Sequence, residues 1–391
     1  MTTEKALFKI IKSEIGGEDF LPNGEKFDYA ALFLLAKRHD LVHLVSDALY
    51  KLSPEDLSEK ARRVYKREHM TAVFREIRFN EATQYIRKIF VLNNVDFILL
   101  KGAVIKNLYP EPWMRTSCDV DVLIKKEDLK RAVEVLKDAG FNTDEKVHMH
   151  DVILYFNDLR IELHFSLYEN LKQTDDILNR TWDYAEPVSD SEYALDHEFF
   201  VLYHLAHMTY HTLTGGCGVR PFIDLYLMTE KNFYDKEKLS PLLKESRLES
   251  FYELAIGVAN AWFGGKELSE SGKRLERYIL SGGAYGTEEN LLAVEGTKHK
   301  SRIGYLFRLA FPPLSDMKEA YPKLKKRPVL LPWYYVKRFF LKLFGKNKDK
   351  TNARIKVVTD AKFAKELSLL IADMGIDKKD IDNISSAKIN E

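Results

Sequence analysis

Two aspartates lie two residues apart in a short apolar segment with the pattern of a strand. Asp119 and Asp121 alternate with Val120 and Val122, and alternate residues of a strand face the same side. Adjacent carboxylates repel each other unless a cation lies between them, and Mg²⁺ prefers such oxygen ligands. The pair therefore predicts a divalent-cation site; an acidic pair on a solvated strand edge is the alternative. On this basis, replacing Asp121 by asparagine should leave the melting temperature unchanged or raise it.

A third carboxylate lies in the same kind of segment. Glu162 lies between Ile161 and Leu163, in a second segment with the pattern of a strand. If the two strands are neighbours, three acids converge. Three acids can hold two divalent ions, of which one activates an attacking hydroxyl and the other neutralises a triphosphate and its leaving pyrophosphate. His164 shares the strand face of Glu162 and is a candidate for proton transfer or nucleotide binding.

A candidate phosphate-binding turn precedes these acids. The segment 99–103 has the pattern of a strand end, a turn and a helix start, and it contains Lys101, Gly102 and Ala103. Backbone amides at a helix N-terminus can hold phosphate, and Lys101 would add positive charge; a solvated lysine at a strand end is the alternative. Arg115 could supply another phosphate contact, or pair structurally with either aspartate.

The periodicity of apolar residues divides the chain into four regions and predicts an α+β fold. Residues 1–93 have helical spacing, with one long helix or two from Pro54 to Phe90. Residues 94–188 read strand, helix, strand, helix, strand, strand, which predicts a small mixed β-sheet core flanked by helical regions. Residues 189–320 form a second helical region, and residues 321–391 a basic and aromatic C-terminal tail.

The second helical region contains two polar groupings. His204, His207 and His211 share one helical face, where they could bind zinc, although packing groups are the favoured interpretation because no fourth ligand is evident. Arg220 and Asp224 lie four residues apart on an expected helix. They could form a salt bridge on the helix surface, or reach toward a nucleotide or acceptor.

The tail contains an amphipathic segment. From Trp333 to Phe344, aromatic and aliphatic residues are interrupted at helical spacing by Lys337, Arg338 and Lys342. Such a segment could contact a membrane surface or an RNA backbone. The favoured interpretation is a helix that packs on the body of the protein with its lysines in water.

Composition excludes few function classes. The chain of 391 residues has 60 basic and 59 acidic residues, so any attraction to nucleic acid or membrane must be local. Its two cysteines, Cys118 and Cys217, lack metal-ligand spacing, and we expect a reducing compartment and a cytoplasmic protein. No segment has the roughly 20 apolar residues that cross a bilayer, and we expect neither export nor a membrane span.

The order of these motifs resembles a known group of enzymes. Lys-Gly-Ala at 101–103, Arg-Thr-Ser-Cys-Asp-Val-Asp at 115–121 and Ile-Glu-Leu-His at 161–164 resemble the DNA polymerase beta-type nucleotidyltransferase superfamily, specifically its uncharacterised bacterial nucleotidyltransferase family. The likeness extends to residues 36–39 upstream and to residues 204–207 and 218–225 downstream.

The resemblance implies a metal-dependent nucleotidyltransferase. Asp119, Asp121 and Glu162 would bind Mg²⁺ or Mn²⁺, and Gly102 would lie in the turn that holds the phosphates of an NTP co-substrate. In this superfamily the turn usually offers glycine followed by glycine or serine, whereas Ala103 follows Gly102 here and provides no hydroxyl.

The expected reaction moves an NMP from the NTP to an acceptor hydroxyl and releases pyrophosphate. A small molecule or a protein is the preferred acceptor. The alternatives are a catalytically degenerate nucleotide-binding or scaffold module, and a tRNA-modifying nucleotidyltransferase of the toxin or antitoxin type.

Overall fold

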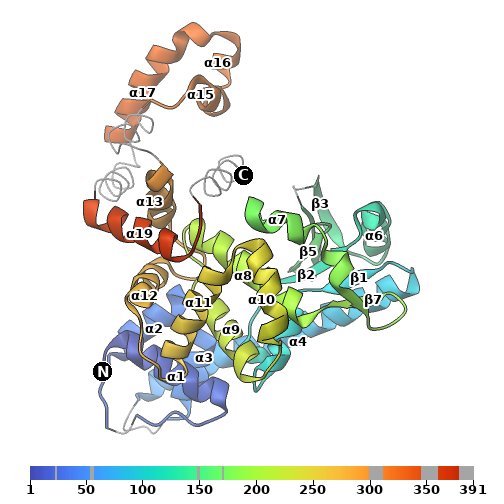
Figure 1. Cartoon of the computed structure of the whole chain (residues 1–391), viewed down its shortest axis with the longest axis vertical. Helices are drawn as coiled ribbons and strands as arrows, with labels where there is room; N and C mark the ends of the chain where they lie inside the picture. Colours follow the sequence, from blue (N-terminus) through green and yellow to red (C-terminus); the bar gives the residue numbers. More distant parts are fainter. Residues whose placement is uncertain are drawn as a thin grey trace.

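The chain folds into a mixed sheet with helices before and after it in sequence, which confirms the α+β class (Figure 1). The computed structural model describes residues 1–22, 24–52, 57–147, 150–169, 171–298, 311–344 and 360–377. Beyond Phe344, only residues 360–377 of the expected tail region are therefore described.

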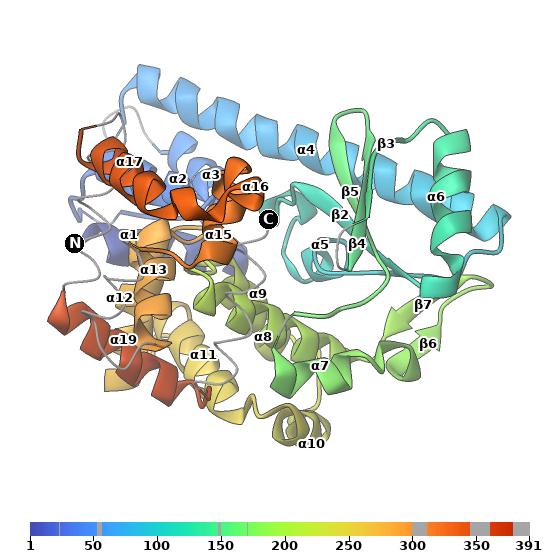
Figure 2. The same cartoon turned by 90° about the horizontal axis from the view of Figure 1, so that it is seen from above.

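The N-terminal region is helical. Its elements are α1 (Thr3–Gly16), α2 (Tyr29–Arg38), α3 (Val42–Tyr50) and α4 (Glu59–Leu92). Helix α4 is a single helix of 34 residues whose first turn is capped by the side chain of Ser58; the expected start near Pro54 lies outside the described residues. Helix α4 runs along the molecule and past the sheet (Figure 2).

Seven strands form one sheet in the order β3-β4-β5-β2-β1-β7-β6. The strands are β1 (Phe97–Leu99), β2 (Asp119–Ile124), β3 (Asn142–Val147), β4 (Asp151–Phe156), β5 (Leu159–His164), β6 (Ala185–Pro187) and β7 (Glu192–Leu195). Strand β2 pairs antiparallel with β1 and parallel with β5. Between the strands lie the short helix α5 (Gly102–Ile105) and α6 (Leu129–Asp138).

Three strands were not expected from the sequence. The edge strand β3 reads NTDEKV, without the apolar alternation by which strands are recognised. The two others, β6 and β7, are three and four residues long, and β7 is held by parallel pairing with β1. These strands form because long-range backbone pairing provides their hydrogen bonds, which no local pattern reveals.

The sheet separates two apolar cores. Val120 and Val122 belong to a cluster with residues of α4 and α6. Leu123 belongs to the larger cluster that contains the helices following the sheet. Because alternate residues share a face, Asp119 and Asp121 lie on the same side of β2 as Leu123. Both aspartates therefore face the second helical region.

That region follows the sheet. Its helices are α8 (His197–Leu213), α9 (Arg220–Glu230), α10 (Lys236–Ser246), α11 (Glu249–Trp262), α12 (Glu270–Gly282) and α13 (Glu288–Lys298). Helix α7 (Lys172–Leu178) comes before β6, and α19 (Ala361–Asp373), from the expected tail region, packs on α12 and α13. A separate arm consists of α15 (Leu314–Ala320), α16 (Lys323–Lys326), the 3₁₀ turn η5 (Pro328–Leu330) and α17 (Leu331–Phe344). Within the described residues, no helix combines the length and the apolar character that crossing a membrane requires.

Two glycine-rich turns lock the helical region together. A Cβ on Gly286 would lie 2.3 Å from the carbonyl carbon of Gly215, and a Cβ on Gly218 would lie 2.8 Å from the Cα of Ala284. Both glycines have positive φ angles. The amide of Ala284 also donates to the carbonyl oxygen of Arg38 (2.9 Å), so the turn after α12 is fixed against both α2 and the α8–α9 connection.

We expect Gly286→Ala to destabilise the protein. The new Cβ meets backbone that cannot move aside, and the φ of +70° adds strain, which by itself costs about 1–3 kcal/mol. Gly257→Ala is the matched control, because this glycine lies inside α11 with no atom within 4 Å of an added Cβ. The control should gain about 0.5–1 kcal/mol. Urea unfolding measures the free energy of unfolding of both variants. Equal values for the two variants would contradict the close contact between the two glycine-rich turns.

A buried carboxyl in α1 should make stability depend on pH. Burial and the nearby carboxylate of Asp47 raise the pKa of Glu14 from 4.5 to about 9. Between these values the unfolded chain has lost the proton that the folded chain keeps, so the stability contribution falls as pH rises. Glu14→Gln should therefore raise the melting temperature at pH 8 and lose this advantage near pH 4.5. A constant difference between wild type and variant across this range would contradict the assignment.

Candidate active site

Two of the three acids, Asp121 and Glu162, come together because β2 and β5 are neighbours. Their parallel register places Asp121 opposite Glu162 and Leu123 opposite His164, with Asp119 opposite Arg160. The expected convergence is therefore met for Asp121 and Glu162, whereas Asp119 lies outside the groups of described side chains that could hold a metal ion. Acceptor atoms of Asp121, Glu162 and His164 all lie within 4.8 Å of one another.

Asp121 is the most strongly bound of the three carboxylates. Its Oδ1 accepts hydrogen bonds from the Nζ of Lys101 (2.8 Å) and the Nε2 of His164 (3.0 Å). Burial alone would raise the pKa of Asp121, but the cation of Lys101 and the bond from His164 hold it well below its ordinary value. Lys101 is therefore not a solvated lysine, and His164 orients the carboxylate at the centre of the site.

The pKa values of the other two carboxylates shift in the opposite direction. Burial and the charge of Asp121 raise the pKa of both Asp119 and Glu162. Arg160 bonds one oxygen of Glu162 at 2.9 Å. The positive charge of Lys101 lowers the pKa of all three acids. A partly buried set of three carboxylates with one shared lysine still favours a further cation.

The residues fit a divalent metal. Carboxylates are the donors that Mg²⁺ and Mn²⁺ prefer, whereas the imidazole of His164 is better matched to ions such as Zn²⁺. His150 and Asp151 form a second group with His164, and the rings of His150 and His164 stack with centroids 5.9 Å apart. Asp121, Glu162 and His164 therefore form a candidate metal site.

The turn after β1 differs from the expected phosphate cradle. The amide of Ala103 donates to the carbonyl oxygen of Leu100 (3.1 Å), so Ala103 does not offer a free amide. Helix α5 is only four residues long. Lys101 has a φ of 38° and a ψ of −108°, a strained conformation of the kind found at functional sites. This backbone directs Lys101 to Asp121.

The hydroxyl that the turn lacks comes from Ser117, which sequence reasoning missed. A Cβ on Gly102 would lie 2.1 Å from the Oγ of Ser117, so only glycine leaves room for this hydroxyl. The Nη1 of Arg115 donates to the same Oγ (2.9 Å). Ser117 lies two residues before Asp119, within the motif that was singled out, but its approach to Gly102 depends on tertiary packing.

Arg115 and Asp224 form one buried ion pair. The Nη2 of Arg115 lies 3.0 Å from Oδ2 of Asp224, and Tyr109 donates its hydroxyl to the other oxygen (2.7 Å). The expected pairing of Arg115 with Asp119 or Asp121 is therefore wrong. The carboxylate of Asp224 is fully used in holding α9 to the loop before β2.

The expected salt bridge between Arg220 and Asp224 is also wrong. Arg220 instead donates to the carbonyl oxygen and the carboxylate of Asp40, in the turn between α2 and α3. Although the residues lie four apart on α9, each has a stronger partner from a different segment. Arg220 thereby joins the first and second helical regions.

Among the described residues, no group of side chains that could hold a metal ion includes the three histidines of α8. His204 donates to the carbonyl oxygen of Pro221 (3.1 Å), whereas His207 bonds Glu169 through Nδ1 (2.7 Å) and meets His211 through Nε2 (3.0 Å). The favoured interpretation as packing groups holds for His204. Glu169, five residues after His164, was not singled out from the sequence because an isolated acid in a loop has no distinguishing pattern.

Tyr285 is a further residue that the sequence did not reveal. Its hydroxyl lies 3.7 Å from the Sγ of Cys118, immediately before Asp119, while most of its ring is exposed. The glycine-rich turn after α12 holds this side chain at the rim of the site. No motif connects residues 118 and 285, which lie far apart in the chain.

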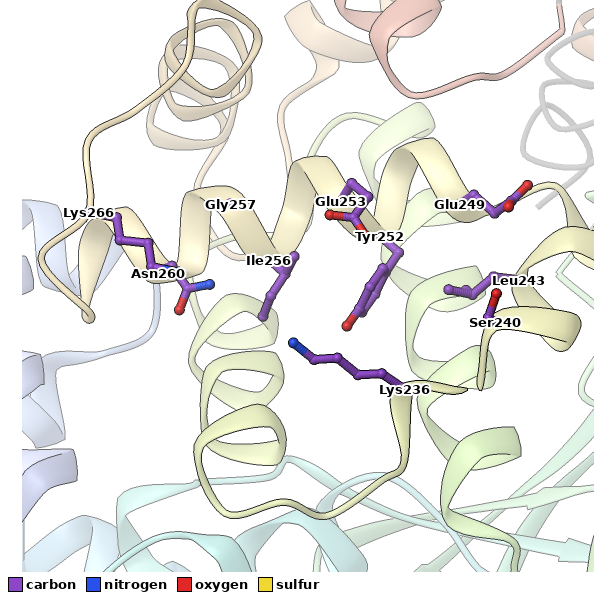
Figure 3. A pocket seen from close by; sticks show the side chains of 10 residues that line it. All are labelled: Lys236, Ser240, Leu243, Glu249, Tyr252, Glu253, Ile256, Gly257, Asn260 and Lys266. Carbon is purple, nitrogen blue, oxygen red and sulfur yellow. The ribbon is translucent and has the colours of Figure 1, made fainter. Parts of the chain in front are cut away.

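A separate cavity of about 470 Å³ lies between α10 and α11 (Figure 3). Lys236, Tyr252, Glu253 and Lys266 are among its lining residues. None of its lining residues comes from β2 or β5. Ligand chemistry at the carboxylates therefore does not involve this cavity.

Comparison with known proteins gives a family but no close relative. The sequence model of a family described as uncharacterised nucleotidyltransferase matches residues 25–264. Neither the curated proteins nor the solved structures contain a match to the chain. The matched segment is more than half of the 391 residues and contains the Lys101 turn, β2, β5 and α9. This chain therefore belongs to the uncharacterised nucleotidyltransferase family.

Proposed function

We propose that the protein transfers an NMP from an NTP to an acceptor hydroxyl and releases pyrophosphate, by the chemistry of the DNA polymerase beta-type superfamily. The register of β2 and β5 is the observation that supports this most, because it aligns Asp121 with Glu162. Asp119 lies two residues earlier on the same face of β2. Together with the Lys101 turn, this arrangement matches the needs of phosphoryl chemistry, in which positioning and charge neutralisation dominate.

Each residue near the carboxylates has a distinct role in this proposal. Asp119, Asp121 and Glu162 hold the cation, and bound Mg²⁺ or Mn²⁺ would neutralise the triphosphate and favour the ionised acceptor hydroxyl. Lys101 keeps Asp121 ionised before substrate binds. Ser117, oriented by Arg115, presents a hydroxyl to a phosphate oxygen, in place of the serine that the turn usually provides.

The reaction balances with these groups. The acceptor oxygen forms a bond to the α-phosphorus while the bond from that phosphorus to the bridging oxygen of the β-phosphate breaks. Pyrophosphate leaves with the bonding electrons. In this proposal Glu162 receives the acceptor proton. The preferred acceptor is a small molecule or a protein side chain.

One observation favours a second candidate, a catalytically degenerate nucleotide-binding module. The ammonium group of Lys101 already lies 2.8 Å from Asp121, so the chain itself supplies one positive charge where a metal ligand is expected. Nucleotide could then bind without turnover. Titration with metal separates the two functions, since a degenerate site needs no divalent ion.

We expect NTP binding to require Mg²⁺ and the carboxylates. Calorimetric titration of wild type with each NTP should give binding with Mg²⁺ that weakens at least tenfold in Glu162→Gln and Asp119→Asn. Asp138→Asn, an exposed change at the end of α6, is the matched control and should bind normally. Pyrophosphate release with an acceptor mixture then tests turnover. Absence of metal-dependent binding in wild type would rule out the proposed transferase.

We also expect Asp121 and Asp119 to differ in metal-free stability. Asp121→Asn removes the charge that Lys101 and His164 bond, and leaving a buried donor poorly paired costs about 1–3 kcal/mol. This reverses the expectation from charge repulsion alone. Asp119→Asn relieves repulsion and should be neutral or stabilising, since its carboxyl has a raised pKa. Chemical denaturation in EDTA compares them; a more stable Asp121→Asn would refute the role of the lysine bridge.

A further inference from the structure

We propose that the arm of residues 311–344 binds the surface of a membrane rich in anionic phospholipid, with α17 lying in the interface. The arm comprises α15, α16, η5 and α17. It stands off the rest of the molecule in Figure 1. This replaces the favoured expectation that the helix packs on the body, and it does not depend on the proposed transfer reaction.

The arm exposes an apolar stripe. Val329 is 85% exposed, Trp333 63%, Val336 48% and Phe340 56%. Trp333, Val336 and Phe340 lie three and four residues apart in α17, which places them on one side of that helix, and Val329 precedes them in η5. Side chains of this size are usually buried, and an exposed apolar row of this kind marks a surface that meets another apolar phase.

The opposite side of α17 is occupied by the arm itself. The rings of Tyr334 and Tyr321 lie 4.7 Å apart, and those of Tyr335 and Phe311 lie 5.3 Å apart. Tyr335 also donates its hydroxyl to the carbonyl oxygen of Pro312 (2.6 Å). These contacts hold the side of α17 with Tyr334 and Tyr335 against the arm, whereas Trp333 and Val336 are exposed.

The charge of this surface selects the partner. Residues 321–344 contain seven basic and no acidic residues, although the whole chain has a net charge of only +1. Lys323, Lys325, Lys326 and Arg327 are exposed just before the stripe, and Lys337 is exposed along its edge. An apolar stripe with a basic border is complementary to anionic headgroups above acyl chains.

The helix is suited to lying on a bilayer rather than crossing it. Its 14 residues span about 21 Å at 1.5 Å per residue, less than the hydrocarbon thickness of about 30 Å. Trp333 and Lys337 are residue types that settle at the boundary between headgroups and acyl chains. An RNA backbone would use the basic residues, but it would leave the exposed apolar surface of Val329, Trp333 and Val336 in water.

A second helix provides the matched control. Helix α4 also exposes Phe74 (61%) and Ile77 (48%), but Arg75, Arg78, Glu76 and Glu81 surround them with both signs of charge. If exposure of apolar groups were sufficient, changes on either helix would weaken vesicle binding equally. If the basic border matters, only changes on the arm will weaken vesicle binding.

Cosedimentation of the full-length protein with vesicles tests this inference. We expect binding to vesicles of phosphatidylcholine and phosphatidylglycerol (3:1) to be at least tenfold tighter than to phosphatidylcholine alone, and to weaken with salt. The double variant Trp333→Ser/Phe340→Ser should lose at least tenfold in binding. Lys325→Glu/Lys326→Glu should abolish the preference for anionic lipid, whereas Phe74→Ser/Ile77→Ser should bind as wild type does.

Four outcomes would overturn the proposal. The first is failure of wild type to bind either vesicle, and the second is equal loss in the α4 control. The third is a wild-type dimer, measured by light scattering, that becomes monomeric in the arm variant and does not bind vesicles; the stripe would then be an interface between two copies. Retention of an RNA oligonucleotide without vesicle binding would likewise assign the basic residues to another partner. Circular dichroism checks that each variant is folded.

Discussion

The ion pair between Lys101 and Asp121 is the interaction on which the rest of the site depends. Three carboxylates share one small, partly buried face of the sheet, and repulsion among them would oppose folding. The ammonium group of Lys101, 2.8 Å from Asp121, offsets this repulsion for the central carboxylate. The consequence appears in the opposite pKa shifts, lowered for Asp121 and raised for Asp119 and Glu162. One acid is therefore held ionised while the other two favour an additional cation.

Placing Lys101 correctly imposes constraints on the residues around it. The chain turns sharply between β1 and α5, with Lys101 itself at a positive φ. Gly102 must follow because Ser117 lies against its Cα, where a Cβ would collide. Arg115 holds Ser117, and Asp224 holds Arg115. A series of buried polar contacts thus connects the Lys101 turn to α9. Within this series, Arg115 and Asp224 are paired with each other.

The helical regions complete the site through contacts that are mostly backbone to backbone. Glycines 215, 218 and 286 allow the turn after α12 to press against the α8–α9 connection, and this brings Tyr285 to Cys118 beside the carboxylates. The arm of residues 311–344 contributes nothing to this packing in the described residues. Its exposed stripe and positive charge instead form a surface whose chemistry is separate from that of the site.

The sequence by itself determined the fold class and singled out Asp121 and Glu162, which the structure brings together. Alternation in β2 and β5 requires Asp119 and Asp121 to share a face and places Glu162 among apolar neighbours, since these are local properties of a strand. Helical spacing likewise predicted α4, α8, α9 and α17, although the polar edge strand β3 gave no such signal.

Only the tertiary structure decided which partner each charged residue has. Spacing along a helix suggested Arg220 with Asp224, but Asp40 and Arg115 come from distant segments and bind these residues instead. Ser117, Glu169 and Tyr285 were missed for the same reason. A long side chain chooses among all groups within reach in three dimensions, and the sequence specifies only those that are near along the chain.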